Sequence, residues 1–245
     1  MRMLTKRGKT AEEGDPQDQY HLGVCYYYGW GVNLCRTAAF NWFQKAAEQG
    51  HVKAQYRLAV CYDFGNGVDE DKKEAVKWYR KAAKKGLAEA QFALGLCYMR
   101  GEGVKANDKE VVKWLRMAAE QGYSEAQFEL GYELAHGEWG DEGLIESVKW
   151  YRMAAKQDHV DSMYHLGRCY EFGDGVRTNS RTAIKWYRKA AEQGDSDALY
   201  SLESLEIKMR RRYKKPKSVS DDKLEQLSFD FDNTTKDLPI AKTNI

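Results

Sequence analysis

The chain has 245 residues with 16 Tyr, 7 Trp and only 3 Pro, a composition that favours packed helices over a disordered chain or a turn-rich β-sandwich. Its formal net charge of +2 predicts no polyanionic partner for the chain as a whole. No apolar run approaches the roughly 18 residues of a membrane-spanning helix, and the polar start lacks a secretory signal. We therefore expect a cytoplasmic protein without a transmembrane segment.

The start of the chain matches the end of a helix that recurs later. Thr10–Gly14 aligns with Ala46–Gly50, where a helical unit ends. We expect residues 1–14 to form a partial N-terminal repeat or cap. Residues 15–207 are then a solenoid of five full repeats plus a terminal capping helix, and residues 208–245 are a basic, flexible tail.

A pattern with a period of 36 residues dominates the sequence. Alanine pairs, a leucine column and Gly-x-Gly-Val segments keep one phase with the tryptophans at Trp42, Trp78, Trp114, Trp150 and Trp186. Each unit is predicted to contain two helices. In the second unit, apolar residues at helical spacing predict a first helix over Ala54–Phe64, which Gly65 stops. Asp71 or a neighbour opens the second helix, and Gly86 ends it.

These residues resemble the Sel-1-like repeat, a relative of the tetratricopeptide repeat. Ala90–Tyr98 matches the first half of that pattern and Glu74–Tyr79 the second half. The resemblance covers about residues 15–205. It implies an all-α, right-handed α/α superhelical solenoid of 36-residue helix-turn-helix repeats. A two-helix unit cannot bury both of its faces alone, so each unit should stack on its neighbours.

The fourth unit departs from the pattern. Gly137-Glu138-Trp139-Gly140 stands where Gly-x-Gly-Val is expected, and Trp139 has no consensus core position to fill. We expect the helices to persist, because Trp150 keeps its register, and the loop to differ. Trp139 is then either a rearranged packing residue or an exposed contact for a partner.

Partner binding is expected on the first helices, which the likeness to tetratricopeptide repeats places inside the concave groove. Two adjacent positions near the end of each first helix vary while the scaffold stays constant. With one residue from an upstream column, the predicted groove residues are Tyr27, Tyr28, Asp63, Phe64, Met99, Arg100, His136, Arg168, Glu171 and Phe172. Aromatic and Arg side chains dominate interface energies, which favours a peptide with apolar anchors and an acidic centre. The alternative is that some of these aromatic side chains are buried between repeats.

The sequence contains no motif for catalysis, a cofactor or a metal. Cys25, Cys61, Cys97 and Cys169 share one column. Helices pack about 8–10 Å apart, whereas disulfide-linked Cα atoms lie within about 7 Å, so small buried thiols in a reducing compartment are expected. The histidines are scattered, and Gly-x-Gly follows a helix rather than a strand, which excludes a phosphate loop. We predict no catalytic residue and no small-molecule substrate.

The tail carries a basic run that includes Arg210, Arg211 and Arg212. It is predicted to be a solvated helix end and linker, with nucleic acid, an anionic membrane surface or nuclear import as alternatives. The tail residues Gln226, Leu227, Phe229 and Phe231 resemble a short peptide that docks in bacterial sliding clamps. The alternative is that this segment folds back on the terminal repeat.

The leading hypothesis is a non-catalytic adaptor or scaffold that binds a protein or peptide in its concave groove. The resemblance also implies a competing class, because some bacterial family members were proposed to act on cell-wall compounds or β-lactams. Such an enzyme needs a polar pocket with a perturbed titratable group. A third class is nucleic-acid or sliding-clamp association through the tail.

Overall fold

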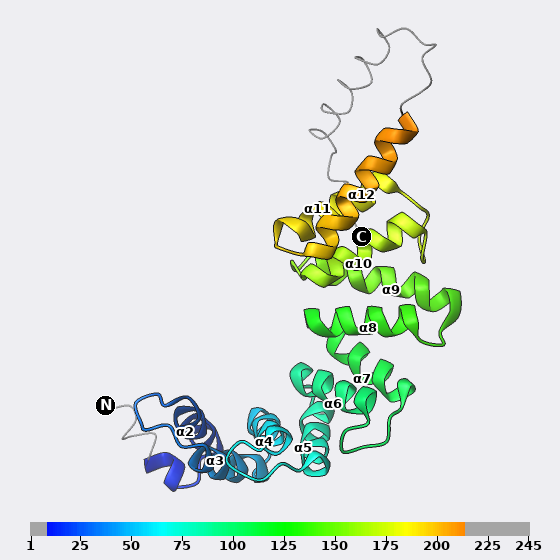
Figure 1. Ribbon diagram of the computed structural model, residues 1–245. Helices are drawn as coiled ribbons and strands as arrows, with labels where there is room; N and C mark the ends of the chain where they lie inside the picture. The colour runs from blue at the N-terminus through cyan, green and yellow to red at the C-terminus, as the bar shows by residue number, and fades with distance from the viewer. Residues whose placement is uncertain (1–8, 214–245) are drawn as a thin grey trace, which may run out of the picture. The chain divides into compact units, whose positions relative to one another are not determined.

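The computed structural model describes residues 9–213, and every regular element in this range is a helix (Figure 1). The chain divides into two units, Met1–Leu199 and Tyr200–Ile245. The first unit contains five helix pairs. Their first helices are α2 (Pro16–Tyr28), α4 (Val52–Phe64), α6 (Ala88–Arg100), α8 (Ser124–His136) and α10 (Val160–Phe172). Their second helices are α3 (Arg36–Glu48), α5 (Lys72–Lys84), α7 (Asp108–Glu120), α9 (Gly140–Ala155) and α11 (Ser180–Glu192).

From α2 to α11 each helix packs against the next one along the chain, as the resemblance predicted (Figure 1). The array is therefore a helical-repeat solenoid, built by local contacts between consecutive elements. A last helix, α12 (Ser196–Tyr213), covers the predicted terminal helix, and the boundary between the two units falls inside it. Among the described residues, no helix combines the length and the apolar character that a membrane span requires.

The ends of the helices follow from local sequence chemistry. Gly65 adopts φ 65°, the left-handed conformation that ends a helix cheaply only in glycine. Asp71 opens α5, because its carboxylate accepts hydrogen bonds from the backbone N–H groups of Lys73 and Glu74 at 2.9 and 3.0 Å. Both boundaries agree with the sequence prediction.

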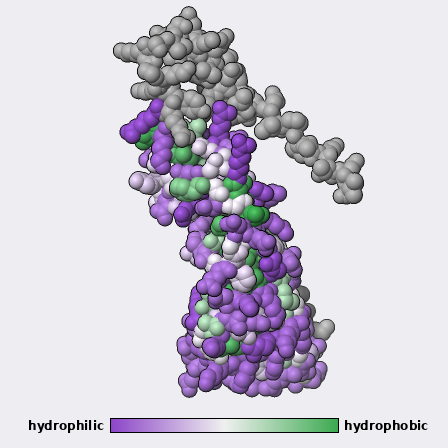
Figure 2. Space-filling model, turned by 90° about the vertical axis from the view of Figure 1, so that its right-hand side faces the viewer, coloured by the Kyte–Doolittle hydropathy of each residue, from purple (hydrophilic) through white to green (hydrophobic). Residues whose placement is uncertain are grey.

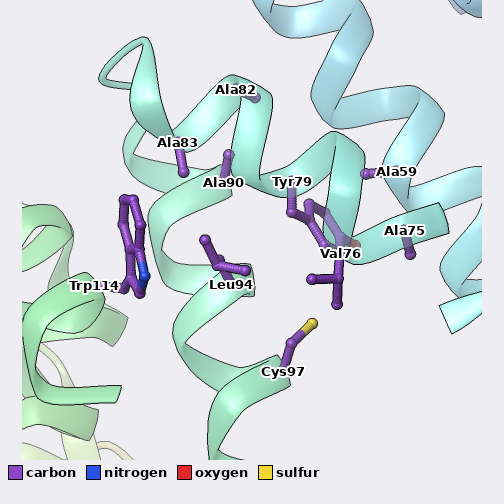
Figure 3. Close-up of a cluster of buried hydrophobic side chains, with 10 residues drawn as sticks. All are labelled: Ala59, Ala75, Val76, Tyr79, Ala82, Ala83, Ala90, Leu94, Cys97 and Trp114. Atoms are coloured by element: carbon purple, nitrogen blue, oxygen red, sulfur yellow. The ribbon is translucent and has the colours of Figure 1, made fainter. Parts of the chain in front are cut away.

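The core lies between the two helices of one repeat and the next pair. Figure 3 shows one cluster, in which Val76 and Tyr79 of α5 point toward Leu94 and Cys97 of α6. Trp114 joins this cluster from α7 and is only 6 % exposed. Large side chains of the tryptophan column thus link one helix pair to its neighbour, while alanines let the helices approach closely.

In three loops the second glycine of Gly-x-Gly, at Gly67, Gly103 and Gly175, contacts the backbone of the preceding repeat. A Cβ at Gly103 would lie 2.1 Å from the carbonyl oxygen of Lys72, and one at Gly67 would lie 2.3 Å from that of Arg36. The backbones touch at these points, so a side chain has no room. The second glycine of these Gly-x-Gly segments therefore allows close packing between repeats.

The fourth repeat has Trp139 in the place of this second glycine, and the local fold changes accordingly. Helix α9 begins at Gly140, so it has 16 residues where the other second helices have 13. The loop shortens, and Trp139 packs partly buried against the core cluster that contains Leu134 and Trp150. Its indole Nε1 is buried without a hydrogen-bond partner.

A column of buried glutamines ties successive second helices together. Gln91 donates to the carbonyl oxygen of Ala83 at 3.1 Å and accepts from Gln121 at 2.7 Å. Gln127 makes the same two bonds, with Ala119 and Gln157. In the second repeat the donor position holds a lysine, Lys85, which bonds elsewhere and leaves Oε1 of Gln55 buried without a partner.

Candidate functional site

The last residue of every first helix is exposed to solvent. Three of these residues are large and apolar or aromatic, with exposed fractions of 44 % for Tyr28, 67 % for Phe64 and 58 % for Phe172. The central two, Arg100 and His136, are exposed and polar. One side chain per repeat is therefore presented at the same end of successive helices.

The residues four positions earlier belong to the same helix face, because positions i and i+4 are neighbours on a helix. They are half-buried in the first three repeats and exposed at Tyr132 and Arg168. We call the two columns together the first-helix face. It consists of Val24, Tyr28, Val60, Phe64, Leu96, Arg100, Tyr132, His136, Arg168 and Phe172.

The surface seen in Figure 2 is mainly hydrophilic, and its hydrophobic side chains form separate patches. The exposed members of the first-helix face are four aromatic residues and three basic residues or histidine, namely Tyr28, Phe64, Tyr132, Phe172, Arg100, His136 and Arg168. Phe64 lies near a cation, Lys72, whose Nζ is 5.5 Å from the ring centroid. Arg168 lies 5.9 Å from the ring of Phe172. Cations beside exposed aromatic rings are a common arrangement in protein interfaces.

The other predicted groove column holds residues that bond within their own repeat. The hydroxyl of Tyr79 donates to Asp63 at 3.0 Å, and Nζ of Lys72 lies 3.1 Å from the same carboxylate. The hydroxyl of Tyr187 donates to Glu171 at 2.9 Å. These carboxylates therefore act as acceptors for buried phenols.

The apolar members of this column also pack internally. Tyr27 lies 6.2 Å from the ring of Phe43, and the guanidinium of Arg36 lies 3.8 Å above the Tyr27 ring. Met99 packs against the cluster that contains Leu115. The sequence analysis left burial between repeats open for the aromatic residues of this column, but it did not predict that Asp63 and Glu171 accept hydrogen bonds from buried phenols. The signal was present, because a carboxylate stands 16 residues before Tyr79 and Tyr187 but not before Phe43 or Leu115.

The fourth repeat breaks this correspondence. Tyr151 is the equivalent of Tyr79 and is 1 % exposed, but the residue 16 positions earlier is Ala135. The hydroxyl of Tyr151 is buried and has no hydrogen-bond partner. A buried, unpaired hydroxyl costs about 1–3 kcal/mol, so the fourth repeat carries an unsatisfied donor that the second and fifth repeats do not.

Aromatic and imidazole rings form a cluster beside the ring of Tyr151. The ring of His165 stacks on Tyr151 with centroids 5.3 Å apart, and His136 lies 6.4 Å from His165. Tyr132 stacks on His136 at 4.1 Å. Burial, with the nearby charges of Arg168 and His136 as lesser causes, lowers the pKa of His165 to about 4, while Asp161 and Asp195 oppose this shift. His165 is therefore neutral at neutral pH.

A second residue beside the first-helix face is perturbed. Glu129 occupies the same repeat position as His165 and is half-buried. Burial raises the pKa of its carboxyl group, and the nearby Arg100 guanidinium opposes this effect. Arg57, Glu129 and His165 share this repeat position, and all three are partly buried.

The cysteine thiols and two further histidines have roles in packing and in the starts of helices. All five cysteines are free, and burial raises the pKa of the thiols of Cys61 and Cys169 to about 11 and of Cys97 to about 12. A thiol is a poor nucleophile under such conditions. The Nδ1 atoms of His51 and His159 accept hydrogen bonds at the starts of α4 and α10. Across the part of the chain that the structure describes, no group of three or more Cys, His, Asp or Glu could hold a metal ion.

Only part of the basic tail falls within the described residues. Arg210 and Arg211 are exposed on α12, and Arg212 belongs to the same helix. The predicted clamp-binding segment, Gln226, Leu227, Phe229 and Phe231, lies outside the described residues.

Comparison with known proteins identifies the repeats. The family model described as the Sel1 repeat matches residues 16–51, 52–87, 88–123, 124–159 and 160–195. A Sel1 repeat protein from Oxalobacter formigenes is 34 % identical, with a TM-score of 0.70 over 77 % of this chain and 75 % of that one. A protective antigen of uropathogenic Escherichia coli is also 34 % identical, with a TM-score of 0.52. The match covers 81 % of this chain and 50 % of the antigen. No curated protein matches the chain.

Proposed function

The chain belongs to the Sel1 repeat family, and on that premise we propose that it is a non-catalytic adaptor that binds a partner protein or peptide along its first-helix face. Sel1 repeat proteins generally mediate protein–protein interactions. Our proposal adds that the first-helix face is the surface that binds the partner. The single observation that carries it is the row of exposed side chains at the ends of the five first helices.

The chemistry of this row suits protein binding. Its exposed aromatic residues are presented on rigid helices, so little conformational entropy is lost when a partner binds them. Aromatic and Arg side chains carry most of the energy of typical interfaces. An extended peptide could contact one side chain per repeat, with apolar anchors at Phe64 and Phe172 and an acidic residue near Arg100.

The test is affinity capture from the native cell, which compares the wild-type chain with the triple variant Phe64→Ala, Arg100→Glu, Phe172→Ala. All three side chains are exposed, so the fold should persist. A matched control changes exposed residues of the second helices by the same kinds of substitution, namely Met117→Ala, Ile145→Ala and Lys185→Glu.

We expect the partners to be lost from the first variant and kept by the control, with circular dichroism unchanged in both. Recovery of the same partners by all three proteins would show that the first-helix face is not the binding surface. Equal losses from both variants would also reject it, because binding would then have no preference for the first helices.

A further inference from the structure

Helix α12 has an exposed side that carries large apolar residues. Its other side is buried at Ala198, Leu202 and Leu205. The exposed fractions of the apolar residues are 49 % for Leu199, 75 % for Tyr200 and 49 % for Ile207. Residues seven or eight positions apart share one side of a helix, so these three side chains form one surface. In each of the five repeats the residue equivalent to Leu199 is buried.

In the fifth repeat the second helix covers the equivalent positions. Tyr164, which stands 36 residues before Tyr200, lies 5.9 Å from the ring of Tyr187 on α11. Glu171, which stands 36 residues before Ile207, accepts the hydrogen bond of the same tyrosine at 2.9 Å. The exposed side of α12 is therefore the side on which the first helix of a repeat packs against its own second helix.

A second helix of the repeat type cannot pack on α12 in this way. The sequence after α12 does not continue the pattern, since Asp222 and Lys223 stand where Trp and Tyr would recur. Glu203 also occupies a position that holds glycine or alanine in the five repeats. At its equivalent Gly167, a Cβ alone would lie 2.6 Å from the ring of Tyr187. The longer side chain of Glu203 keeps such a helix away, even one from another copy of the chain.

The tail segment 221–232 has the composition to cover this side instead. Its apolar residues are Leu224, Leu227, Phe229 and Phe231, and it carries five acidic residues against one lysine. Arg210 and Arg211 are exposed on α12 and follow Ile207 by three and four residues, which places them on the same side of the helix. Arg210 also lies 4.0 Å from Glu206, a pair that is exposed at the arginine and therefore weak. The segment and the helix thus offer both apolar and opposite-charge contacts to each other.

The connection between the two is long enough. Helix α12 ends at Tyr213. At 1.5 Å per residue, Ile207 and Tyr200 lie about 9 and 20 Å back along the helix axis. Residues 214–223 can span about 33 Å when extended, so Leu224 can reach either residue. A connection this short also gives the segment an effective concentration at the helix in the millimolar range.

We propose that residues 221–232 dock on the exposed side of α12. The leucine and phenylalanine side chains pack against Tyr200 and Ile207, and the acidic side chains lie beside Arg210 and Arg211. All of these residues belong to the unit Tyr200–Ile245. The inference goes beyond the proposed function, because the contact involves neither the first-helix face nor a partner protein.

The test is photo-cross-linking within the full chain. Tyr200 is replaced by p-benzoylphenylalanine, which keeps an aromatic ring at the position and reacts with neighbouring C–H bonds. The purified protein is irradiated at low concentration, and the products are mapped by mass spectrometry. The control probe replaces Ile145, which is 62 % exposed on α9 and lies outside the unit that contains the tail.

Three variants are compared in the Tyr200 probe protein. Leu227→Asp with Phe229→Asp removes two apolar contacts, and Arg210→Glu with Arg211→Glu reverses the charge of the helix. The matched control, Leu238→Asp with Ile240→Asp, makes the same kind of change in the tail outside the segment. Circular dichroism should be the same for all of them.

We expect the Tyr200 probe to react within one chain and mainly with residues 221–232. The Leu227 and Phe229 variant should lower that yield by about fivefold or more, because burial of each apolar side chain contributes about 1.5–3 kcal/mol. The charge reversal should lower it by about threefold at low salt and less at high salt. The Leu238 and Ile240 control should keep the yield of the parent protein.

Four results would overturn the inference. The first is a product that joins two chains, which would make a second copy the occupant of this side. The second is the absence of any cross-link from Tyr200. The third is a spread of products along the tail that matches the spread from the Ile145 probe. The fourth is an equal loss of yield in the Leu227 and Phe229 variant and in its matched control.

Discussion

The hydroxyl of Tyr79 donates a 3.0 Å hydrogen bond to the carboxylate of Asp63, which lies 16 residues earlier on the first helix of the same repeat. Tyr79 is 2 % exposed, so water cannot replace this acceptor. The pair joins the two helices of one repeat through buried polar atoms, and it explains why a carboxylate occupies a position that otherwise holds apolar residues.

Removal of the hydroxyl should therefore have opposite consequences in two repeats. Tyr79→Phe leaves Asp63 without its phenol donor and should lower the free energy of unfolding by about 1 kcal/mol. Tyr151→Phe removes a donor that has no acceptor and should leave stability unchanged or raise it. Chemical denaturation of both variants measures the difference. An equal loss in both would mean that Tyr151 does have a partner in solution.

The glutamine column gives a prediction for a stabilising change. Lys85→Gln should place an amide donor near the unpaired Oε1 of Gln55, as Gln121 does for Gln91. We expect the free energy of unfolding to rise by about 1 kcal/mol. The reverse change, Gln121→Lys, should lower it by a similar amount. A denaturation midpoint for Lys85→Gln that is below the wild type would contradict the assignment.

Backbone contact between repeats should make one glycine far less replaceable than another. Gly86→Ala strains a residue at φ +89° but meets no atom within 4 Å, so we expect a loss of about 1–2 kcal/mol. Gly103→Ala adds to a similar strain a clash with the carbonyl oxygen of Lys72 and should cost considerably more. Thermal unfolding of the two variants tests this. Similar melting temperatures would show that the loops can separate at little cost.

The depressed pKa of His165 predicts a pH dependence of stability. The unfolded chain binds a proton at this residue below about pH 6.5, whereas the folded chain does so only below about pH 4. Stability should therefore fall as the pH is lowered through this window, by on the order of 2 kcal/mol, and no further from this group below it. His165→Gln should remove this part of the slope. Denaturation midpoints of both proteins at pH 7, 6, 5 and 4 provide the measurement, and parallel profiles would refute the prediction.

Most of the fold could be predicted from the sequence, because the same signals for the start and end of a helix recur in five repeats. Gly65 and Asp71 mark the ends of two helices through their own conformational and hydrogen-bonding preferences, and the period identifies their equivalents elsewhere. Trp139 was harder. The sequence indicated a changed loop, but the extension of α9 back to Gly140 depends on how the indole packs against the neighbouring cluster.

The candidate site was less predictable, since it depends on contacts between helices. Two adjacent variable columns looked equivalent in the sequence. The structure places Phe64 in solvent and its neighbour Asp63 against Tyr79, because consecutive helix residues point about 100° apart. The unpaired hydroxyl of Tyr151 depends on a contact between helices. In the second and fifth repeats the residue 16 positions earlier accepts the hydrogen bond of the tyrosine, and in the fourth repeat that residue is Ala135.

The glutamine column has a consequence for how such a chain can change its length. The pairing of Gln91 with Gln121 lies inside one 36-residue unit, whereas the bond that crosses to the preceding unit ends on the main-chain carbonyl of Ala83. Every residue offers a carbonyl, so this crossing bond does not depend on which unit comes before. Unequal recombination that duplicates or deletes a whole unit would keep it, and arrays of different length could arise without new mutations at the junctions.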